Sequence, residues 1–353
     1  MKAILRDLKR TAKRILQTLD DVFVRLGAAN RFLAKLYYLL NGRYGREQQA
    51  NLSGKLAYKK SLSDPSINTS LLRRNIHRLE KGLLMRPRRV PFGVSYIGET
   101  VLAYRNAVSS GTEGDELRWA HDVLSEYMNV TPNHEAVDGF RSIMNSVRHP
   151  SPGGPADARR LIPYTRLESD MPQVGIDDLL KLAKHRRSVR WYRPDPIPRD
   201  AIDRAIEIAS YSPTACNRQP YEFRIFDDPE LVSRIISIPM GTTGFAEQVP
   251  AVAVVVGRQR NYPADRDRHL IYVDGSLAAM SFVYGLEVQG LSSCCINWPD
   301  IEALERKMEC ELQLASDERP IMLIAFGYPD LSGLVANSTK KPLSTICKYN
   351  FEK

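Results

Sequence analysis

The sequence predicts an α+β fold with a mainly helical N-terminal extension, and three observations lead to this class. From Gly175 onward, stretches with helical periodicity alternate with short apolar runs of strand length. Residues 252–256 are apolar on both alternating faces, which predicts a strand at the centre of its sheet. Before residue 165, the periodic stretches are helical. We therefore expect a sheet covered by helices, preceded by further helices.

The composition is that of a globular protein and excludes several classes. The chain has 353 residues, of which 43% are hydrophobic and 26% charged, so it can bury a sizeable core. It lacks the run of about 18 apolar residues that a membrane span needs. No two histidines lie four residues apart, and the five cysteines form no Cys-x-x-Cys pair. We therefore predict neither a metal site nor a disulfide framework.

The positive charge is concentrated at the N-terminus. The net charge is +9, yet residues 1–100 carry 21 Lys and Arg against 7 acids, so the remainder is net negative. The first 26 residues predict a basic amphipathic helix, and residues 31–40 predict a second helix that ends at Asn41-Gly42. In the first helix the apolar positions are Ile4, Leu8, Ile15, Leu19, Val22 and Leu26, and the basic ones are Lys2, Arg6, Lys9, Arg10, Lys13 and Arg14.

Two interpretations of this basic segment remain open. The helices pack on their own domain or on a partner subunit, or they lie on an anionic membrane surface. The segment lacks the uninterrupted apolar stretch of a secretory signal, so we expect a cytoplasmic protein, with peripheral attachment to the inner face of the membrane as the second interpretation. No nucleic-acid-binding motif accompanies the charge, so we expect no nucleic-acid partner.

Composition shifts divide the chain into three predicted regions. Residues 1–50 form the basic amphipathic segment, residues 51–165 a helical accessory region, and residues 166–353 the α+β domain. The boundary is predicted from a Pro/Gly-rich linker near residues 149–156. Within the accessory region, residues 48–70 predict a polar linker and residues 76–93 a short helix broken at Gly82 and followed by a basic, proline-rich loop. Helices are predicted at 95–109 and 115–129.

The α+β domain is predicted from residue 175 onward. Its helix at 272–289 is rich in small residues, which allow another backbone to approach closely, so we expect this helix to be a packing axis. The other helices are expected at 175–185, 198–211, 229–237 and 299–310, and the strands at 221–227, 250–257, 291–297 and 321–327.

The most informative segment follows the first of these helices. If residues 186–190 are extended, Arg186, Ser188 and Arg190 share one face and present two guanidinium groups and a hydroxyl. Guanidinium groups match phosphate oxygens bidentately, so this arrangement predicts a receptor for a terminal phosphate. Residues 212–223, rich in small polar groups, follow a helix and could hydrogen-bond a planar heterocycle.

These segments, in this order, resemble the nitroreductase superfamily of FMN-dependent oxidoreductases over residues 175–345. The resemblance implies a homodimer with a central mixed β-sheet flanked by helices and with two FMN sites at the subunit interface. It implies that Arg186, Arg187, Ser188, Arg190 and Lys340 bind the phosphate and ribityl chain, and that the Cys295–Ile296 backbone contacts flavin N5. The loop that a partner subunit lays against the flavin corresponds to Pro213, Thr214, Cys216, Asn217 and Gln219.

The implied activity is that of the cofactor. FMN accepts a hydride from NADH or NADPH and passes electrons to a small organic acceptor, while the protein supplies orientation and electrostatics. No catalytic side chain is therefore expected. Two alternatives are specialised flavin chemistry, such as oxidation of a bound substrate by O₂, and a non-catalytic scaffold. The stretch from His77 to Gly93 also resembles extended nitroreductase-like proteins of bacterial surface-polysaccharide gene clusters, which implies an anionic or glycan-type substrate, or a role in polysaccharide assembly beside the membrane.

Several neighbouring residues have a structural and a functional interpretation. We expect Cys294 and Cys295 to be inert packing residues rather than a redox dithiol. We expect Trp191 and Tyr192 to be core residues rather than residues that stack on a bound ring. His185 suits the end of a helix. On the predicted helix near residue 80, Arg78, Glu80 and Lys81 either reach the active site or form a surface ion-pair face, and the sequence does not favour one over the other.

Overall fold

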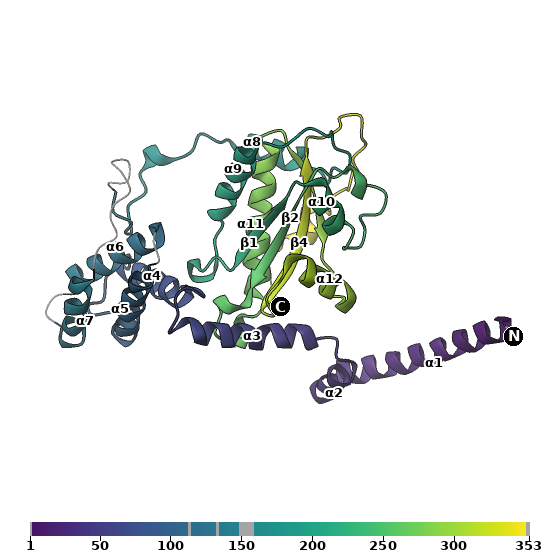
Figure 1. The fold of residues 1–353 in the computed structure, drawn as a ribbon. Helices are drawn as coiled ribbons and strands as arrows, with labels where there is room; N and C mark the ends of the chain where they lie inside the picture. Colours follow the sequence, from purple (N-terminus) through teal and green to yellow (C-terminus); the bar gives the residue numbers. More distant parts are fainter. Residues whose placement is uncertain (1, 112–113, 132–133, 148–158, 351–353) are drawn as a thin grey trace. The chain divides into compact units, whose positions relative to one another are not determined.

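A computed structural model describes residues 2–111, 114–131, 134–147 and 159–350 (Figure 1). The chain divides into two compact units, Met1–Ala50 and Asn51–Lys353. The first unit contains α1 (Lys2–Ala29) and α2 (Arg31–Asn41), as the periodicity predicts. The Asn30 side chain caps α2 by accepting hydrogen bonds from the amides of Phe32 and Leu33, and Gly42 ends it in a left-handed conformation with φ of 63°.

Helix α3 (Gly45–Ser61) corrects the prediction of a linker over residues 48–70. The helix has no apolar stripe, and its polar side chains make the tertiary contacts instead. Asn51 and Lys55 donate to the Asp265 carboxylate at 2.6 and 3.0 Å, and Tyr58 is buried. At Gly54, a Cβ atom would lie 2.6 Å from Cβ of Gln259, so the absence of a side chain permits this approach. Periodicity alone therefore could not reveal the helix.

Four helices with a shared apolar core form the accessory region. These are α4 (Ser70–Leu83), α5 (Val94–Ser109), α6 (Asp115–Val130) and α7 (Glu135–Ser146). Helix α7 was not predicted. Helix α4 begins six residues before the predicted start at residue 76 and ends one residue beyond the predicted break at Gly82. The predicted linker near residues 149–156 lies outside the described residues. The largest buried core side chains of the region include Ile76, Leu79, Ile97, Tyr104, Leu117, Leu124 and Tyr127.

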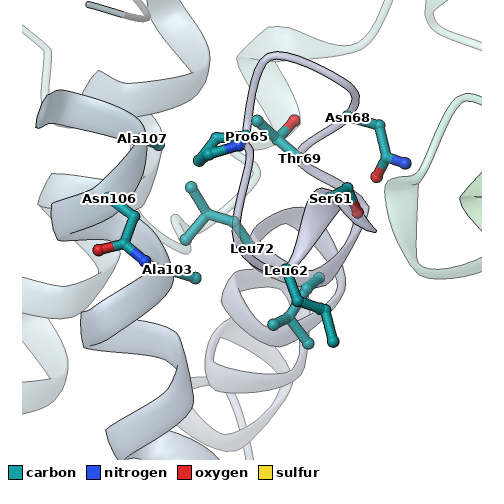
Figure 2. Close-up of a pocket in the computed structure, with 10 residues that line it drawn as sticks. Ser61, Leu62, Pro65, Asn68, Thr69, Leu72, Ala103, Asn106 and Ala107 are labelled. Atoms are coloured by element: carbon teal, nitrogen blue, oxygen red, sulfur yellow. The ribbon is translucent and has the colours of Figure 1, made fainter. Parts of the chain in front are cut away.

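A small cavity lies where the α3–α4 connection meets α4 and α5 (Figure 2). Its walls include Leu62, Pro65, Leu72 and Ala103, and its volume is about 20 Å³. That volume accommodates a water molecule and nothing larger. The accessory core is therefore closely packed at this point and offers no ligand pocket there.

The second unit contains a four-stranded sheet in the order β1-β2-β4-β3, and its named strands are all antiparallel. The strands are β1 (Tyr221–Phe226), β2 (Ala251–Arg258), β3 (Ser292–Asn297) and β4 (Glu318–Gly327). The expected mixed character is limited, among the described residues, to an isolated parallel bridge between Ser188 and Ser293. Strand β2 is interior and buried from Ala251 to Gly257, which confirms the prediction of a central strand.

Helices cover both faces of the sheet, as expected for a nitroreductase-like fold (Figure 1). Alternation along β2 explains the two layers: Ala253 and Val255 contact the α9–α11 side, whereas Val254 and Val256 contact the α10–α12 side. The helices are α8 (Ile176–His185), α9 (Arg199–Ser210), α10 (Pro229–Ile236), α11 (Leu270–Glu287), α12 (Glu302–Leu312) and α13 (Leu343–Ile346), with 3₁₀ turns η2 (Glu168–Asp170), η3 (Ala215–Asn217), η4 (Ala246–Gln248), η5 (Gln259–Asn261) and η6 (Asp265–Asp267).

Helix α11 is the packing axis that its small residues predict. A Cβ atom at Gly285 would lie 2.9 Å from Cα of Ala205, so α9 packs against α11 at backbone distance. In the described part of the chain, no helix is both long and apolar enough to cross a membrane. The same residues contain no cluster of three or more His, Cys, Asp or Glu side chains suited to a metal ion.

Candidate functional site

The arginine motif is attached to the open edge of β3. Helix α8 ends when the Arg186 amide donates to the Leu182 carbonyl at 2.9 Å, and the chain then extends. The Val189 amide donates to the Ser293 carbonyl at 3.0 Å, and Ser188 forms its bridge with Ser293. We call residues 186–190 and the neighbouring edge of β3 the arginine corner.

The predicted face of the motif forms around Cys294. Burial raises the pKa of this thiol, while the charge of Arg190, a hydrogen bond with Ser188 and the charge of Arg186 act in the opposite direction. The three side chains of the predicted face therefore all act on the same thiol. Among the described residues, no carboxylate forms an ion pair with Arg186, Arg187 or Arg190. Their positive charge is thus available for an anion.

A cavity of about 250 Å³ lies beside the motif. Glu287 reaches into it from α11 with 3% of its side chain exposed, and its Oε1 lies 2.8 Å from Nδ1 of His185. The other carboxylate oxygen is buried and has no hydrogen-bond partner among the described residues. The cavity is otherwise lined mainly by apolar side chains and the motif itself: Arg187, Val189, Arg190, Trp191, Ser292, Pro329, Asp330, Leu331, Gly333, Leu334 and Val335.

The two aromatic residues after the motif differ in environment. Tyr192 is buried and its hydroxyl donates to the carbonyls of Val189 and Ala325 at 2.7 and 3.2 Å, so it is a core residue. Trp191 is 41% exposed and lines the cavity. The sequence analysis expected both to be core, which is wrong for Trp191 because strand alternation turns its side chain outward.

The edge position of β3 determines which backbone amides are accessible. Because the Ser293 carbonyl points away from β4, alternation directs the amide of Cys295 to the same open side and that of Ile296 toward β4. Cys294 is buried and Cys295 exposed, and both are free thiols. A ligand at this edge would therefore meet the backbone of Cys295.

The second predicted segment, residues 213–219, precedes β1 and contains η3. Cys216, Asn217 and Gln219 have φ angles of 56°, 52° and 49°, in the left-handed region that costs a non-glycine residue roughly 1–2 kcal/mol. Local bonds support this backbone: the Gln219 amide donates to Oγ1 of Thr214 at 3.1 Å, and its side-chain amide to Oδ1 of Asn217 at 3.2 Å. We call residues 213–219 the loop corner.

A buried carboxylate on α11 anchors the loop corner. Oδ2 of Asp274 accepts hydrogen bonds from the Ala215 amide at 3.1 Å and from the Tyr262 hydroxyl at 2.6 Å. Burial raises the pKa of Asp274, and these two donors act in the opposite direction. Asp274 therefore joins the packing axis to the loop. An acid within the first two turns of a largely apolar helix was a visible signal that sequence reasoning missed.

The accessory region also contacts the loop corner. Nε of Arg73 on α4 donates to the Asn217 carbonyl at 2.8 Å. The residues that the sequence analysis weighed on this helix serve its packing: the Arg78 guanidinium stacks 3.6 Å from the Tyr96 ring centroid, and Glu80 accepts from Nε1 of Trp119 at 3.0 Å. Lys81 is exposed. No local pattern singled out Arg73.

Strand register places the two corners at diagonally opposite ends of the sheet. The loop corner leads into Tyr221, which pairs with Gly257, and Gly257 pairs with Arg319. The arginine corner meets Ser293, which pairs with Phe326. Arg319 and Phe326 are seven residues apart, so the corners are separated by roughly 23 Å along the strands and roughly 14 Å across the sheet. One chain therefore does not bring its two predicted half-sites together.

Lys340 belongs to neither corner in the described structure. It lies exposed in the segment between β4 and α13. The sequence analysis associated it with the phosphate through the family resemblance, and that role stays a prediction.

The domain has an α+β fold with a basic motif at one edge of its sheet, and comparisons with known proteins show what it is similar to. Residues 183–242 and 237–328 match the nitroreductase family. The chain is 23% identical over 212 residues to YdgI of Bacillus subtilis, named as an NAD(P)H nitroreductase, covering 50% of this chain and 99% of the relative. It is 23% identical over 195 residues to an iodotyrosine deiodinase of Nematostella vectensis, covering 48% and 74%.

Solved structures of the same kind are also similar. An FMN-dependent nitroreductase from Clostridium difficile aligns with 21% identity and a TM-score of 0.43, covering 49% of this chain and 99% of that one. The family match, over residues 183–328, and the curated relatives agree that this part of the chain is similar to nitroreductases. The family match does not extend to residues 1–182.

Proposed function

We propose that this chain is an FMN-dependent oxidoreductase that takes a hydride from NADH or NADPH and reduces a small organic acceptor as a homodimer. The observation that carries the proposal is the separation of the two half-sites on one sheet. One half offers unneutralised guanidinium groups and the other a strained, polar loop, so a second chain is needed to complete a site. When bound, FMN supplies the hydride and electron chemistry.

The residues present fit this cofactor. Arg186 and Arg190, which share one face of the motif, offer a dianionic phosphate two guanidinium groups, and Arg187 adds positive charge beside them. Among the described residues, none of the three forms an ion pair with a carboxylate. Ser188 adds a hydroxyl on the same face. The Cys295 amide on the open edge of β3 is suited to a flavin ring edge, which refines the expectation for Cys295–Ile296. On the loop corner of the partner, Pro213, Thr214, Cys216, Asn217 and Gln219 would border the ring, and Lys340 would add charge near the phosphate.

The outer face of α11 supports a homodimer. Helix α11 is apolar around most of its circumference, and such a helix is normally buried on all sides. Its inner face packs on the sheet, whereas Val273, Leu277, Met280 and Val288 are 51%, 43%, 38% and 62% exposed at helical spacing. A second copy that covers this stripe would bury it. The resemblance to nitroreductases implies the same homodimer, and one similar solved structure is described as an FMN-dependent nitroreductase.

The first test is an anaerobic visible spectrum of the purified protein before and after NADH, and then NADPH. A flavin spectrum that bleaches with either reductant supports the proposed reductase. A flavin spectrum that persists favours the alternative of specialised flavin chemistry, such as oxidation of a bound substrate by O₂. A colourless protein that FMN does not reconstitute contradicts the proposal and favours a non-catalytic scaffold.

A mixed dimer tests the two-chain site. One chain carries Arg186→Ala and Arg190→Ala, and the other carries Asn217→Gly and Gln219→Ala. If the sites are shared between chains, the isolated mixed dimer has one intact and one doubly altered site, and it binds one FMN per dimer with wild-type affinity. If each chain forms its own site, both sites in that dimer are impaired, and tight binding is lost.

Domain roles follow from this assignment as part of the proposal. Residues 166–353 form the FMN domain, residues 51–165 an accessory region and residues 1–50 an attachment segment. The named relatives include nitroreductases and iodotyrosine deiodinases, so their names do not fix the acceptor. The resemblance of residues 77–93 to polysaccharide-cluster proteins supports an anionic or glycan-type acceptor, which a panel of such compounds, scored by flavin reoxidation, would test.

For the first unit, we propose binding to an anionic membrane surface from the cytoplasmic side. Phe23, Leu26, Phe32, Leu39 and Leu40 are between 48% and 79% exposed. Basic side chains of α1 are exposed as well, as expected of an interfacial helix. Co-flotation with phosphatidylserine vesicles, but not with neutral ones, is the expected result. A protein that floats with neither, and whose oligomeric state changes without residues 1–45, would indicate helix packing on a partner.

A further inference from the structure

We propose that Arg73, on α4 of the accessory region, is a positioning residue for the flavin site, because it holds the loop corner in its strained conformation. This inference rests on the proposed function, since it takes the loop corner as a flavin-binding surface. It makes the accessory helices part of the site, although they lie outside the family match.

The contact lies at the point where the loop is most strained. Nε of Arg73 donates to the Asn217 carbonyl at 2.8 Å, and Cys216 and Asn217 are consecutive residues with positive φ. Such a conformation persists only when its surroundings fix it. On either side, contacts from the α+β domain hold the loop: Asp274 accepts from the Ala215 amide, and the Asn261 side chain donates to the Arg218 carbonyl at 3.3 Å. Among the described residues, the tertiary hydrogen bond to the central carbonyl, that of Asn217, comes from Arg73.

Arg73 is itself held in place. Its Nη1 lies 3.0 Å from Oε2 of Glu116, its guanidinium is 5.5 Å from the Trp119 ring centroid, and its side chain is 15% exposed. Trp119 is fixed in turn by Glu80. A guanidinium with an ion pair on one side, a ring beneath it and a carbonyl at its Nε has little freedom to move. It therefore transmits the position of α4 and α6 to the loop.

This arrangement assigns a specific role to the extension. A flavin-facing loop fixed only by its own domain would not depend on residues 51–165. Here a hydrogen bond between residues 144 positions apart joins the accessory region to the loop corner. Its donor is a charged guanidinium group, which strengthens the bond. We therefore expect flavin affinity and the environment of the bound flavin to depend on Arg73 more than global stability does.

The experiment separates the loop contact from the ion pair beside it. Glu116→Gln removes the ion pair but retains Arg73 and its bond to Asn217. Arg73→Met combined with Glu116→Gln also removes the donor, keeps an unbranched side chain against Trp119, and leaves no unpaired buried carboxylate. The readouts on full-length protein are the Kd for FMN from flavin fluorescence, visible circular dichroism of bound flavin, and the thermal unfolding midpoint.

The expected Kd for FMN changes less than about twofold for Glu116→Gln and rises about tenfold or more for the double variant, with altered flavin dichroism. Arg73→Lys with Glu116→Gln restores a donor and recovers most of the affinity. If the double variant binds FMN like Glu116→Gln while unfolding at a lower temperature, Arg73 is only structural and the inference is wrong.

Failure of the proposed function gives a different pattern. If the unmodified protein does not bind FMN, or if Arg186→Ala and Arg190→Ala leave its Kd unchanged, the flavin site itself is misassigned. If those arginine variants lose FMN and the Arg73 double variant does not, only the positioning role fails.

Discussion

The arginine corner and the loop corner are built in opposite ways. The arginine corner consists of consecutive residues on an extended strand, bonded to the edge of β3 and without carboxylate ion pairs in the described structure. The loop corner consists of left-handed, non-glycine residues held by Asp274, Asn261 and Arg73 from distant parts of the chain. The first is an array of charges set by local spacing, and the second is a shape maintained by tertiary contacts.

This difference explains how two such regions could share one ligand. An anion is recognised by charge, so a few neighbouring residues on one strand can bind it. A planar ring instead requires a surface of fixed shape. Because the corners lie diagonally across one sheet, we infer that the charge array of one protomer faces the shaped loop of its partner.

Removing the charge array should have the largest effect. Replacing Arg186 and Arg190 with alanine should weaken FMN binding about 100-fold or more, because two charge-assisted contacts to the phosphate are lost. The thermal midpoint should change little, since neither residue forms an ion pair in the described structure. Arg199→Ala, on the exposed surface of α9, is the matched control. Wild-type FMN content in the double variant would place the phosphate elsewhere.

Removing the anchor of the loop corner should affect stability and binding together. Asp274→Ala leaves the Tyr262 hydroxyl and the Ala215 amide without an acceptor, which should lower the free energy of unfolding by about 2 kcal/mol or more. FMN affinity should fall as the loop relaxes. Asp274→Asn retains an acceptor oxygen and should be milder. Chemical denaturation measures the free energy of unfolding, and flavin titration measures the Kd for FMN. If Asp274→Ala and Asp274→Asn lose the same amount of stability and of FMN affinity, Asp274 does not act as the hydrogen-bond acceptor that anchors the loop corner.

The pH dependence of stability provides a second measurement on Asp274. Burial raises its pKa above the ordinary value, so the folded state binds the proton more tightly than the unfolded state. Its contribution to stability is therefore present below about pH 4 and declines as the pH rises through the raised pKa. Asp274→Asn should lack this decline. Chemical unfolding of both proteins across the acid range gives the free energy of unfolding at each pH. If this free energy changes with pH to the same extent in both proteins, Asp274 is not a buried carboxyl group with a raised pKa.

The accessory core should respond to pH at the alkaline end. Burial raises the pKa of Tyr104 to about 12, so the folded state keeps a proton that the unfolded state loses near pH 10. Stability should fall between about pH 10 and 12 by roughly 2 kcal/mol, and Tyr104→Phe should remove this contribution. If Arg73 couples the regions, the wild-type protein should release FMN over the same range. A Tyr104→Phe protein with an unchanged alkaline slope would contradict the prediction.

Removing the first unit should leave both corners unaffected. Deletion of residues 1–45 should retain FMN content and affinity, because the two compact units divide near residue 50. Vesicle co-flotation should be lost. An apo or unfolded product would show that the extension belongs to the flavin domain, and unchanged flotation would place membrane binding outside α1 and α2.

Local sequence patterns were sufficient for most elements and insufficient for others. Helices α5, α6 and α8–α12 and all four strands follow from periodicity, and the buried run of β2 follows from its unbroken apolar residues. Helix α3 was missed because Asn51, Lys55 and Gly54 serve contacts with residues more than 200 positions away. The expected mixed sheet has only one isolated parallel bridge among the described residues.

The sequence by itself determined the class of fold and the central strand, because period and spacing act within a few residues. Only the tertiary structure decided that the two half-sites lie at opposite corners, that the amide of Cys295 is the one directed outward, and that Asp274 and Arg73 hold the loop. The physical reason is that strand register and loop conformation depend on contacts between groups that are distant in the sequence. A buried carboxylate or a hydrogen-bonded carbonyl produces no periodic pattern in the amino-acid sequence.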